Sequence, residues 1–235
     1  MSGWATKRFW TRATAEAAGN GFAILLDGRA VKTPAKAPLV VPTLALATAI
    51  AAEWDAQTGK VRPETMPLTR AANSAIDKVG PLRAEVIAEL SGYGGSDLLC
   101  YRAEHPAALT ARQAAGWDPL LHWSAETLDA PLAVTHGVIH VAQDPASLDR
   151  LHGHVAAFSD FGLAGLHDLV AISGSLVLAL AVAHGRLTAE DAFAVSRIDS
   201  HWQAEQWGSD EEEQAAEALR LAAFRQADRF CALCR

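Results

Sequence analysis

Histidine is the residue type that first suggests chemistry, because this chain of 235 residues contains nine. His136 and His140 have the four-residue separation of a helical zinc motif, but no glutamate lies between them to activate water. Their surroundings, Val-Thr-His-Gly-Val-Ile-His-Val, are typical of a strand, on which residues four apart lie ~13 Å from each other. His152 and His154 lack an evident third ligand. The histidines therefore predict no metal centre.

Other motifs resemble catalytic or redox sites only in part. The glycine cluster in residues 91–96 lacks the Gly-Lys-Ser/Thr ending of a phosphate-binding loop. Ser173-Gly-Ser175 lies in a helical context without the glycine that precedes a nucleophilic serine. Cys231 and Cys234 have no second pair and no adjoining strand. Three carboxylates are candidates for acid–base catalysis, with nothing in the sequence to show that they converge: Glu53, Asp55 and Asp97.

Tryptophan in polar surroundings is a more informative feature. Seven tryptophans are present, and an indole serves cores and interfaces alike because it combines a large apolar area with one polar atom. The segment 199–213 places Trp202 and Trp207 beside five carboxylates: Glu205, Asp210, Glu211, Glu212 and Glu213. A charged surface with aromatic anchors is what a protein-binding face needs. A solvated and capped helix start explains the acidic run equally well.

Composition and charge narrow the class of protein. The chain is 50% hydrophobic and 20% charged, which is ordinary for a globular protein, and three cysteines fit a reducing compartment. The longest uncharged stretch, 169–183, is broken by small polar residues and predicts a core helix rather than a membrane span. The first residues lack the apolar run of a signal peptide, so we expect a cytoplasmic protein with no membrane insertion.

The charge distribution indicates two units with different surfaces. The net charge of −7 disfavours general nucleic-acid binding. Residues 1–78 carry 10 basic and 6 acidic side chains, whereas residues 79–235 carry 10 basic and 21 acidic ones. The acidic second part is suited to steering a basic partner, although two solvated surfaces of different charge are an equally good reading.

The expected fold is α+β, with an α+β domain over 1–79 and a helical domain over 80–235. Asp27-Gly28 predicts a tight hairpin turn, and further strands are expected at 9–14 and 39–41. Thr43 is expected to cap a helix that ends near Gly59, and a second helix is expected over 69–79. In the second domain we expect a helix over 81–91 and helices that begin at Asp118-Pro119 and Asp144-Pro145, with a β-hairpin within 132–141. A helical region is expected over 161–184, interrupted near Gly174. Two final helices are expected to begin at Thr188 and Ser209.

Six segments in order resemble the assembly chaperone family of F-type ATP synthase. They are Gly21-Phe-Ala-Ile-Leu-Leu-Asp-Gly-Arg-Ala-Val-Lys-Thr-Pro34, Ala52-Glu-Trp-Asp-Ala-Gln57, Met66-Pro-Leu-Thr-Arg-Ala-Ala-Asn73, Ser96-Asp-Leu-Leu-Cys-Tyr-Arg-Ala103, Trp117-Asp-Pro-Leu-Leu-His-Trp123 and Trp202-Gln-Ala-Glu-Gln-Trp-Gly208. The similarity runs from about Arg8 to Glu213. Each segment is weak by itself, and the six together are specific.

This resemblance implies a non-enzymatic chaperone that binds the unassembled alpha subunit of the catalytic head. It implies no cofactor and no small-molecule substrate, in a mitochondrial matrix or a bacterial cytoplasm, and the Ala-rich composition favours the bacterial setting. For the partner-binding face we expect Trp202, Glu205, Trp207 and Asp210, followed by Trp54 and Asp55. Trp54 also fits a core position, because it continues the apolar helix stripe of Ile50 and Ala51. Two alternatives stay open: a metal-dependent or small-molecule enzyme that uses the His-rich second domain, and an adaptor for another protein.

Overall fold

An Asp-Gly turn organises the sheet near the start of the chain. In the computed structural model, which describes residues 7–235, Asp27 and Gly28 have φ angles of 47° and 79°, as a type I′ turn requires. The turn joins β2 (Gly21–Leu26) to β3 (Arg29–Ala30), and β2 pairs antiparallel with β1 (Ala13–Ala18) and β4 (Val40–Val41). The predicted hairpin and the strand within 39–41 are confirmed. The strand expected at 9–14 begins later, at Ala13.

Gly21 is required where β2 passes the backbone of β4. A Cβ at this position would lie 2.5 Å from the carbonyl oxygen of Val41 and 3.0 Å from Cγ1 of Val40. Because a backbone atom cannot move aside cheaply, we expect Gly21→Ala to lower the free energy of unfolding by about 1–3 kcal/mol. Urea denaturation checks this, with Gly95→Ala as a control, because that glycine does not have a positive φ and the added Cβ meets no atom within 4 Å. A variant as stable as the wild type would contradict the close packing.

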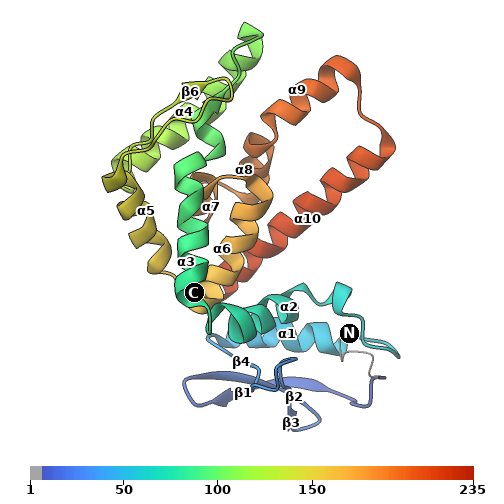
Figure 1. Ribbon diagram of the computed structural model, residues 1–235. Coiled ribbons are helices and arrows are strands. Elements are labelled where there is room, and N and C mark those ends of the chain that lie inside the picture. Colours follow the sequence, from blue (N-terminus) through green and yellow to red (C-terminus); the bar gives the residue numbers. More distant parts are fainter. Residues whose placement is uncertain (1–6) are drawn as a thin grey trace. The chain divides into compact units, whose positions relative to one another are not determined.

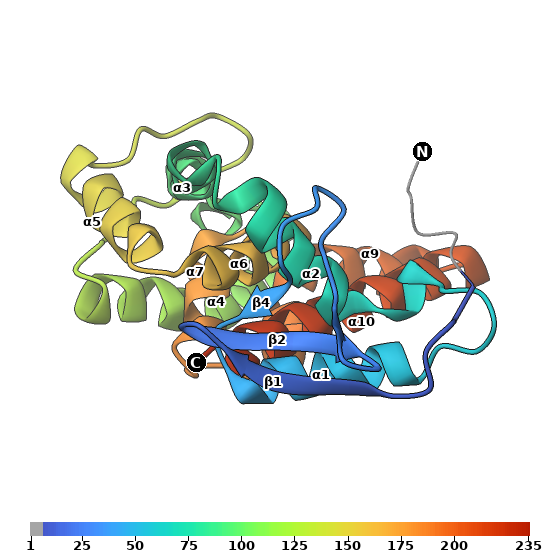
Figure 2. The same ribbon diagram turned by 90° about the horizontal axis from the view of Figure 1, so that it is seen from below.

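Two helices lie side by side over one face of this sheet (Figures 1 and 2). The helix α1 (Leu44–Asp55) begins at Thr43, whose hydroxyl oxygen accepts from the backbone N–H of Leu46 at 3.1 Å, so the predicted cap is confirmed. The helix α2 (Pro67–Ser74) continues into a π-helical turn, Ala75–Val79. The Glu53 carboxylate accepts from the first N–H groups of α2, at 2.8 Å from the nitrogens of both Leu68 and Thr69. Glu53 therefore caps a neighbouring helix.

The chain divides into two units. Unit 1 contains the residues up to Arg83 together with Ser159–Gly165 and Arg229–Arg235, and unit 2 contains Ala84–Phe158 and Leu166–Asp228. The α+β class is confirmed, because the antiparallel sheet lies in unit 1 and helices dominate unit 2. The two late segments of unit 1 lie outside the range 1–79 that was predicted for a first domain.

Helices make up most of the chain after residue 83, and α6 and α10 each have residues in both units. The helices are α3 (Arg83–Gly92), α4 (Ala107–Thr127), α5 (Pro145–Ala156), α6 (Asp160–Ser173), α7 (Leu176–Ala183), α8 (Ala189–Ser196), α9 (Ile198–Trp207) and α10 (Glu211–Leu233). The predicted cap at Asp144 and the interruption at Gly174, which has a φ of 73°, are confirmed. The sequence predicts two final helices, whereas the structure has three there: α8, α9 and α10.

The expectation of a helix start at Asp118-Pro119 is wrong. Both residues lie inside α4, which begins after Pro106 and runs through them without a break. The residues that flank them, Trp117, Leu120 and Leu121, are buried, so burial of this face keeps the chain helical despite the missing N–H of the proline. Asp118 pairs with the buried Arg102 instead, at 2.7 Å.

The β-hairpin expected within 132–141 is also wrong. Only a two-residue strand forms there, β6 (Thr135–His136), and it pairs in parallel with β5 (Tyr101–Arg102). Gly137 does have a positive φ, 75°, but its N–H donates to the carbonyl of Arg102 at 2.8 Å. Gly137 therefore bonds to β5, far upstream in the chain, and does not close a hairpin.

A buried carboxylate fixes the start of α7 in unit 2. Asp97 is fully buried, and its Oδ1 accepts from the hydroxyl of Ser175 at 2.7 Å and from the N–H of Leu99 at 3.0 Å. Its Oδ2 accepts from the N–H of Val177 at 3.0 Å. Ser175 is itself the N-cap residue of α7. Asp97 therefore satisfies donors from two separate segments, which is a structural role rather than an acid–base one.

Candidate partner-binding site

The helix α9 presents most of its surface to solvent. Only Ile198, at its first turn, is buried, and the helix ends at Gly208 with a φ of 81°. Gln113 on α4 donates to the Asp199 carboxylate at 2.6 Å, and the indole N–H of Trp117 donates to the carbonyl of Val195 at 3.0 Å. These bonds attach the first turn of α9 and the last turn of α8 to α4. The later turns of α9 carry Trp202, Glu205 and Trp207, three of the residues predicted for the partner-binding face.

A stacked ion pair lies at the middle of α9. The guanidinium of Arg112 donates to both carboxylate oxygens of Glu205, at 2.7 and 2.9 Å, and its central carbon lies 5.0 Å from the ring centre of Trp202. Hydrogen bonding from Arg112 holds the pKa of Glu205 below its ordinary value, and the same bond raises the pKa of Arg112. Both charges persist at neutral pH, and the bidentate geometry orients the Trp202 indole.

Trp207 and Asp210 lie on either side of the turn between α9 and α10. Trp207 is 80% exposed. The Asp210 carboxylate accepts from the N–H of Glu213 at 2.7 Å and so caps α10, which runs back in roughly the opposite direction to α9 (Figure 1). The acidic residues of the first turn of α10, Glu211–Glu213, also suit the positive end of the helix dipole. The expected helix start and an exposed acidic surface are therefore both present.

Four of the six residues proposed from sequence lie on α9 and the turn that follows it, and Arg112 joins two of them, Trp202 and Glu205. We call the group formed by Arg112, Trp202, Glu205, Trp207 and Asp210 the α9 surface. The pairing of Arg112 with Glu205 was not predicted, because Arg112 lies 93 residues before Glu205 and no local motif marks it. His201 adds a further link, since its Nε2 lies 2.6 Å from Oε1 of Glu217 on α10.

Trp54 and Asp55 belong to unit 1 and have local packing roles. Trp54 is 7% exposed, and its ring meets that of Trp10 edge to face with centroids 5.3 Å apart. The Asp55 carboxylate accepts from the N–H of Ala13 at 2.8 Å and lies 3.6 Å from the guanidinium of Arg8. Trp54 thus occupies the core position that its helix stripe indicated.

The remaining chemical candidates have structural partners in the described part of the chain. His140 contacts the hydroxyl of Tyr101 at 2.9 Å, His152 contacts Ser91 at 3.1 Å, and His154 contacts the carbonyl of Leu128 at 3.1 Å. Burial raises the pKa of the Cys234 thiol to about 12. Within residues 7–235, no group of three or more His, Cys, Asp or Glu side chains is placed to hold a metal ion. In the same range, no helix is both long and apolar enough to cross a bilayer.

Comparison with known proteins decides the family. A family model described as the ATP12 chaperone protein matches residues 7–125, which is half of the chain. The chain belongs to the ATP12 chaperone family. The resemblance to the assembly chaperones of F-type ATP synthase is therefore confirmed, and members of the ATP12 family are named as chaperones rather than as enzymes.

ATP12 structures from bacteria match nearly the whole chain. The crystal structure of Atp12 from Paracoccus denitrificans is 54% identical with a TM-score of 0.95, and the match covers 97% of this chain and 98% of that one. A mutant of the same bacterial Atp12p is 53% identical, with the same coverage and TM-score. A mitochondrial protein, atp12 of Schizosaccharomyces pombe, is 26% identical over 216 residues, which is 86% of this chain and 74% of that relative.

Proposed function

We propose that this ATP12-family protein holds the free alpha subunit of F-type ATP synthase through the α9 surface until the beta subunit replaces it. The family membership supports a role in ATP synthase assembly, and the alpha subunit is the partner that the sequence resemblance implies. The observation that carries the choice of surface is Trp207, a large apolar side chain 80% exposed beside an acidic helix start. We propose the bacterial cytoplasm as its location, by similarity to the bacterial relatives.

The physical need for such a protein follows from how the subunits associate. An alpha subunit without its beta neighbour exposes the surface of a large future interface, and exposed apolar patches of that size promote aggregation. A chaperone that covers this surface must still release it. Binding of about 8–12 kcal/mol, which is micromolar to nanomolar, meets both needs. Exchange needs no ATP hydrolysis if the alpha–beta interface is the stronger one.

The α9 surface has the features of a binding face. Trp202 and Trp207 supply the aromatic area that dominates interface energies, and Glu205, Asp210 and the three glutamates of α10 supply charge for a basic partner surface. The bond from Arg112 fixes Glu205 in one orientation before binding, which lowers the entropy lost on association. We propose that Trp54 and Asp55 stabilise the fold of unit 1, since Trp54 is buried there.

Exchanging the charges of Arg112 and Glu205 tests whether Glu205 contacts the partner. We expect Glu205→Arg to weaken binding of purified alpha subunit about tenfold or more, because it places a cation on the acidic face. The double variant Arg112→Glu/Glu205→Arg restores an ion pair in the opposite orientation. We expect the double variant to remain weak, because the charge that the partner meets is still reversed. Isothermal titration calorimetry with purified alpha subunit measures both affinities.

The control for this pair is Glu126→Arg, an exposed site near the other end of α4 with the same change of charge. It should bind like the wild type. Recovery of affinity in the double variant would show that Glu205 acts only by holding Arg112. Loss of helical circular dichroism in Glu205→Arg would show that the residue is needed for folding.

A further inference from the structure

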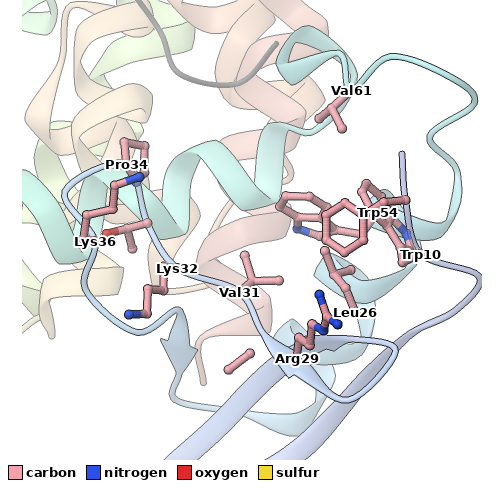
Figure 3. Close-up of a pocket in the computed structure, with 12 residues that line it drawn as sticks. Trp10, Leu26, Arg29, Val31, Lys32, Pro34, Lys36, Trp54 and Val61 are labelled. Atoms are coloured by element: carbon pink, nitrogen blue, oxygen red, sulfur yellow. The ribbon is translucent and has the colours of Figure 1, made fainter. Parts of the chain in front are cut away.

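A pocket in unit 1 lies apart in sequence from the residues of the α9 surface. Its volume is about 280 Å³, and its walls come mainly from residues 9–10, β3, the loop that follows β3 and the end of α1 (Figure 3). Drug-sized ligand sites typically reach about 300–1,000 Å³, so this pocket is at the small end of that range and has room for one large side chain. Its walls are formed by Phe9, Trp10, Leu26, Arg29, Ala30, Val31, Lys32, Thr33, Pro34, Lys36, Trp54 and Val61.

One end of the pocket is aromatic and aliphatic. Trp10 and Trp54 lie close together there, with Val61 and Val31 nearby (Figure 3). Phe9 continues this surface outward: its ring centroid lies 5.3 Å from that of Trp10, and its side chain is 61% exposed. An exposed phenylalanine next to two indoles is an apolar area that a ligand side chain would cover.

The other end of the pocket is basic. Lys32 and Lys36 lie there, whereas Arg29 lies beside Leu26, on the same side of the pocket as Trp10 and Trp54 (Figure 3). None of these three side chains forms a hydrogen bond or an ion pair with another residue in the described range 7–235. The neighbouring Asp27 carboxylate accepts from the N–H groups of Thr11 and Arg12, both at 2.9 Å, which lower its pKa more than Arg29 does. The cations therefore lack a matching set of anions.

The loop that carries Lys36 is held in place by several bonds. The Asp77 carboxylate accepts from the Thr33 hydroxyl at 2.6 Å and from the N–H of Ala35 at 3.0 Å, and the Lys36 N–H donates to the carbonyl of Thr33 at 2.9 Å. Lys36 has a φ of 72°, a conformation that non-glycine residues seldom adopt. The fixed loop positions the Lys36 backbone beside the pocket before any ligand arrives.

We propose that this pocket binds an acidic segment of a protein partner, with one aromatic or aliphatic side chain inserted against Trp10 and Trp54 and its carboxylates beside Lys32 and Lys36. Charge complementarity selects the occupant: three cations that form no ion pair within residues 7–235 border a cavity whose size admits one side chain. An exposed phenylalanine at the rim extends the contact beyond the inserted side chain. This site shares no residue with the α9 surface and does not depend on which subunit that surface holds.

The test is selection of peptides by the full-length protein. A phage library of random nine-residue peptides is selected on the wild type and counter-selected on Lys32→Glu/Lys36→Glu. Both lysines are exposed, so this variant should fold, which circular dichroism and urea denaturation verify. We expect enriched peptides to carry Asp or Glu around one apolar residue. Tryptophan fluorescence should report their binding, because Trp10 and Trp54 line the pocket.

Three variants test whether binding depends on the pocket and its lysines. Lys32→Glu/Lys36→Glu should weaken the selected peptides at least tenfold, whereas Lys60→Glu/Lys78→Glu, with the same charge change at exposed sites that do not line the pocket, should leave affinity unchanged. Ala30→Trp, which keeps the charges and fills the cavity, should weaken binding as well. Failure to enrich any peptide, enrichment without an acidic bias, or equal affinity for both double variants would overturn the proposal.

Discussion

Asp97→Ala is expected to lower the free energy of unfolding by about 3–5 kcal/mol. The substitution removes the acceptor of three hydrogen bonds in a fully buried place, so the donors on Leu99, Ser175 and Val177 are left without a partner. Each buried donor left unsatisfied costs about 1–3 kcal/mol, partly offset by the removal of a buried charge. Urea denaturation followed by circular dichroism measures the loss. A change below about 1 kcal/mol would contradict the role assigned to this carboxylate.

Asp97→Asn separates the charge from the hydrogen bonds. The amide keeps an acceptor for two of the three donors, so the expected loss at neutral pH is smaller than in Asp97→Ala, about 1–3 kcal/mol. Burial raises the pKa of Asp97 above its ordinary value of 3.8, so the folded state holds the proton more tightly than the unfolded state. The contribution of Asp97 to stability therefore falls as pH rises from 3.8 through the folded-state pKa.

This pH dependence gives a second measurement on the same pair of proteins. Because asparagine does not titrate, Asp97→Asn does not lose this contribution to stability as pH rises. We therefore expect its stability relative to the wild type to improve as pH is raised from about 4 to 7. Urea midpoints at several pH values provide the comparison, and a constant difference would show that burial does not perturb Asp97.

Trp207→Ala is expected to weaken binding of the alpha subunit by about 2 kcal/mol, which is roughly 30-fold. The indole is the most exposed large aromatic side chain on the α9 surface, so a partner that covers it removes its apolar area from water. Stability should change little, because the side chain is already 80% exposed in the free protein. Isothermal titration calorimetry and urea denaturation together separate these two effects.

Leu219→Ala is the matched control for Trp207→Ala. Leu219 is 73% exposed on α10 and lies six residues beyond Glu213, the last acidic residue of the first turn, so removing it deletes exposed apolar area outside the α9 surface. We expect its affinity to equal that of the wild type. Equal losses in both variants would indicate that the partner covers all of this part of unit 2, and an unchanged Trp207→Ala would move the binding face elsewhere.

Local signals predicted most of the fold because their causes are local. The Asp27-Gly28 turn, the Thr43 cap and the Asp144 cap each depend on atoms within a few residues, and each is present. The errors arise where contacts with residues distant in the sequence outweigh the local preference. Pro119 stays within α4 because the residues around it are buried, and Gly137 turns toward the backbone of Arg102 rather than into a hairpin.

Only those residues of the candidate site that lie close together in the sequence were predictable. Trp202, Glu205, Trp207 and Asp210 lie within nine residues, so composition alone drew attention to them. Arg112 and Gln113 have no such signal, because their positions opposite α9 depend on how two helices pack. The cations of the unit 1 pocket belong to the excess of basic residues in the range 1–78, but the paired indoles depend on the contact of Trp10 with Trp54.

The late segments of unit 1 set the order in which the chain reaches its final structure during translation. The hydroxyl of Thr43 donates to the carbonyl of Leu233, and the ring of Phe161 lies 6.4 Å from that of Phe230. A ribosome exposes residues in sequence order, so α1 emerges long before the residues that contact its first turn. Unit 1 is thus the first to be synthesised and the last to be completed, and stalled chains that lack residues 229–235 cannot finish it.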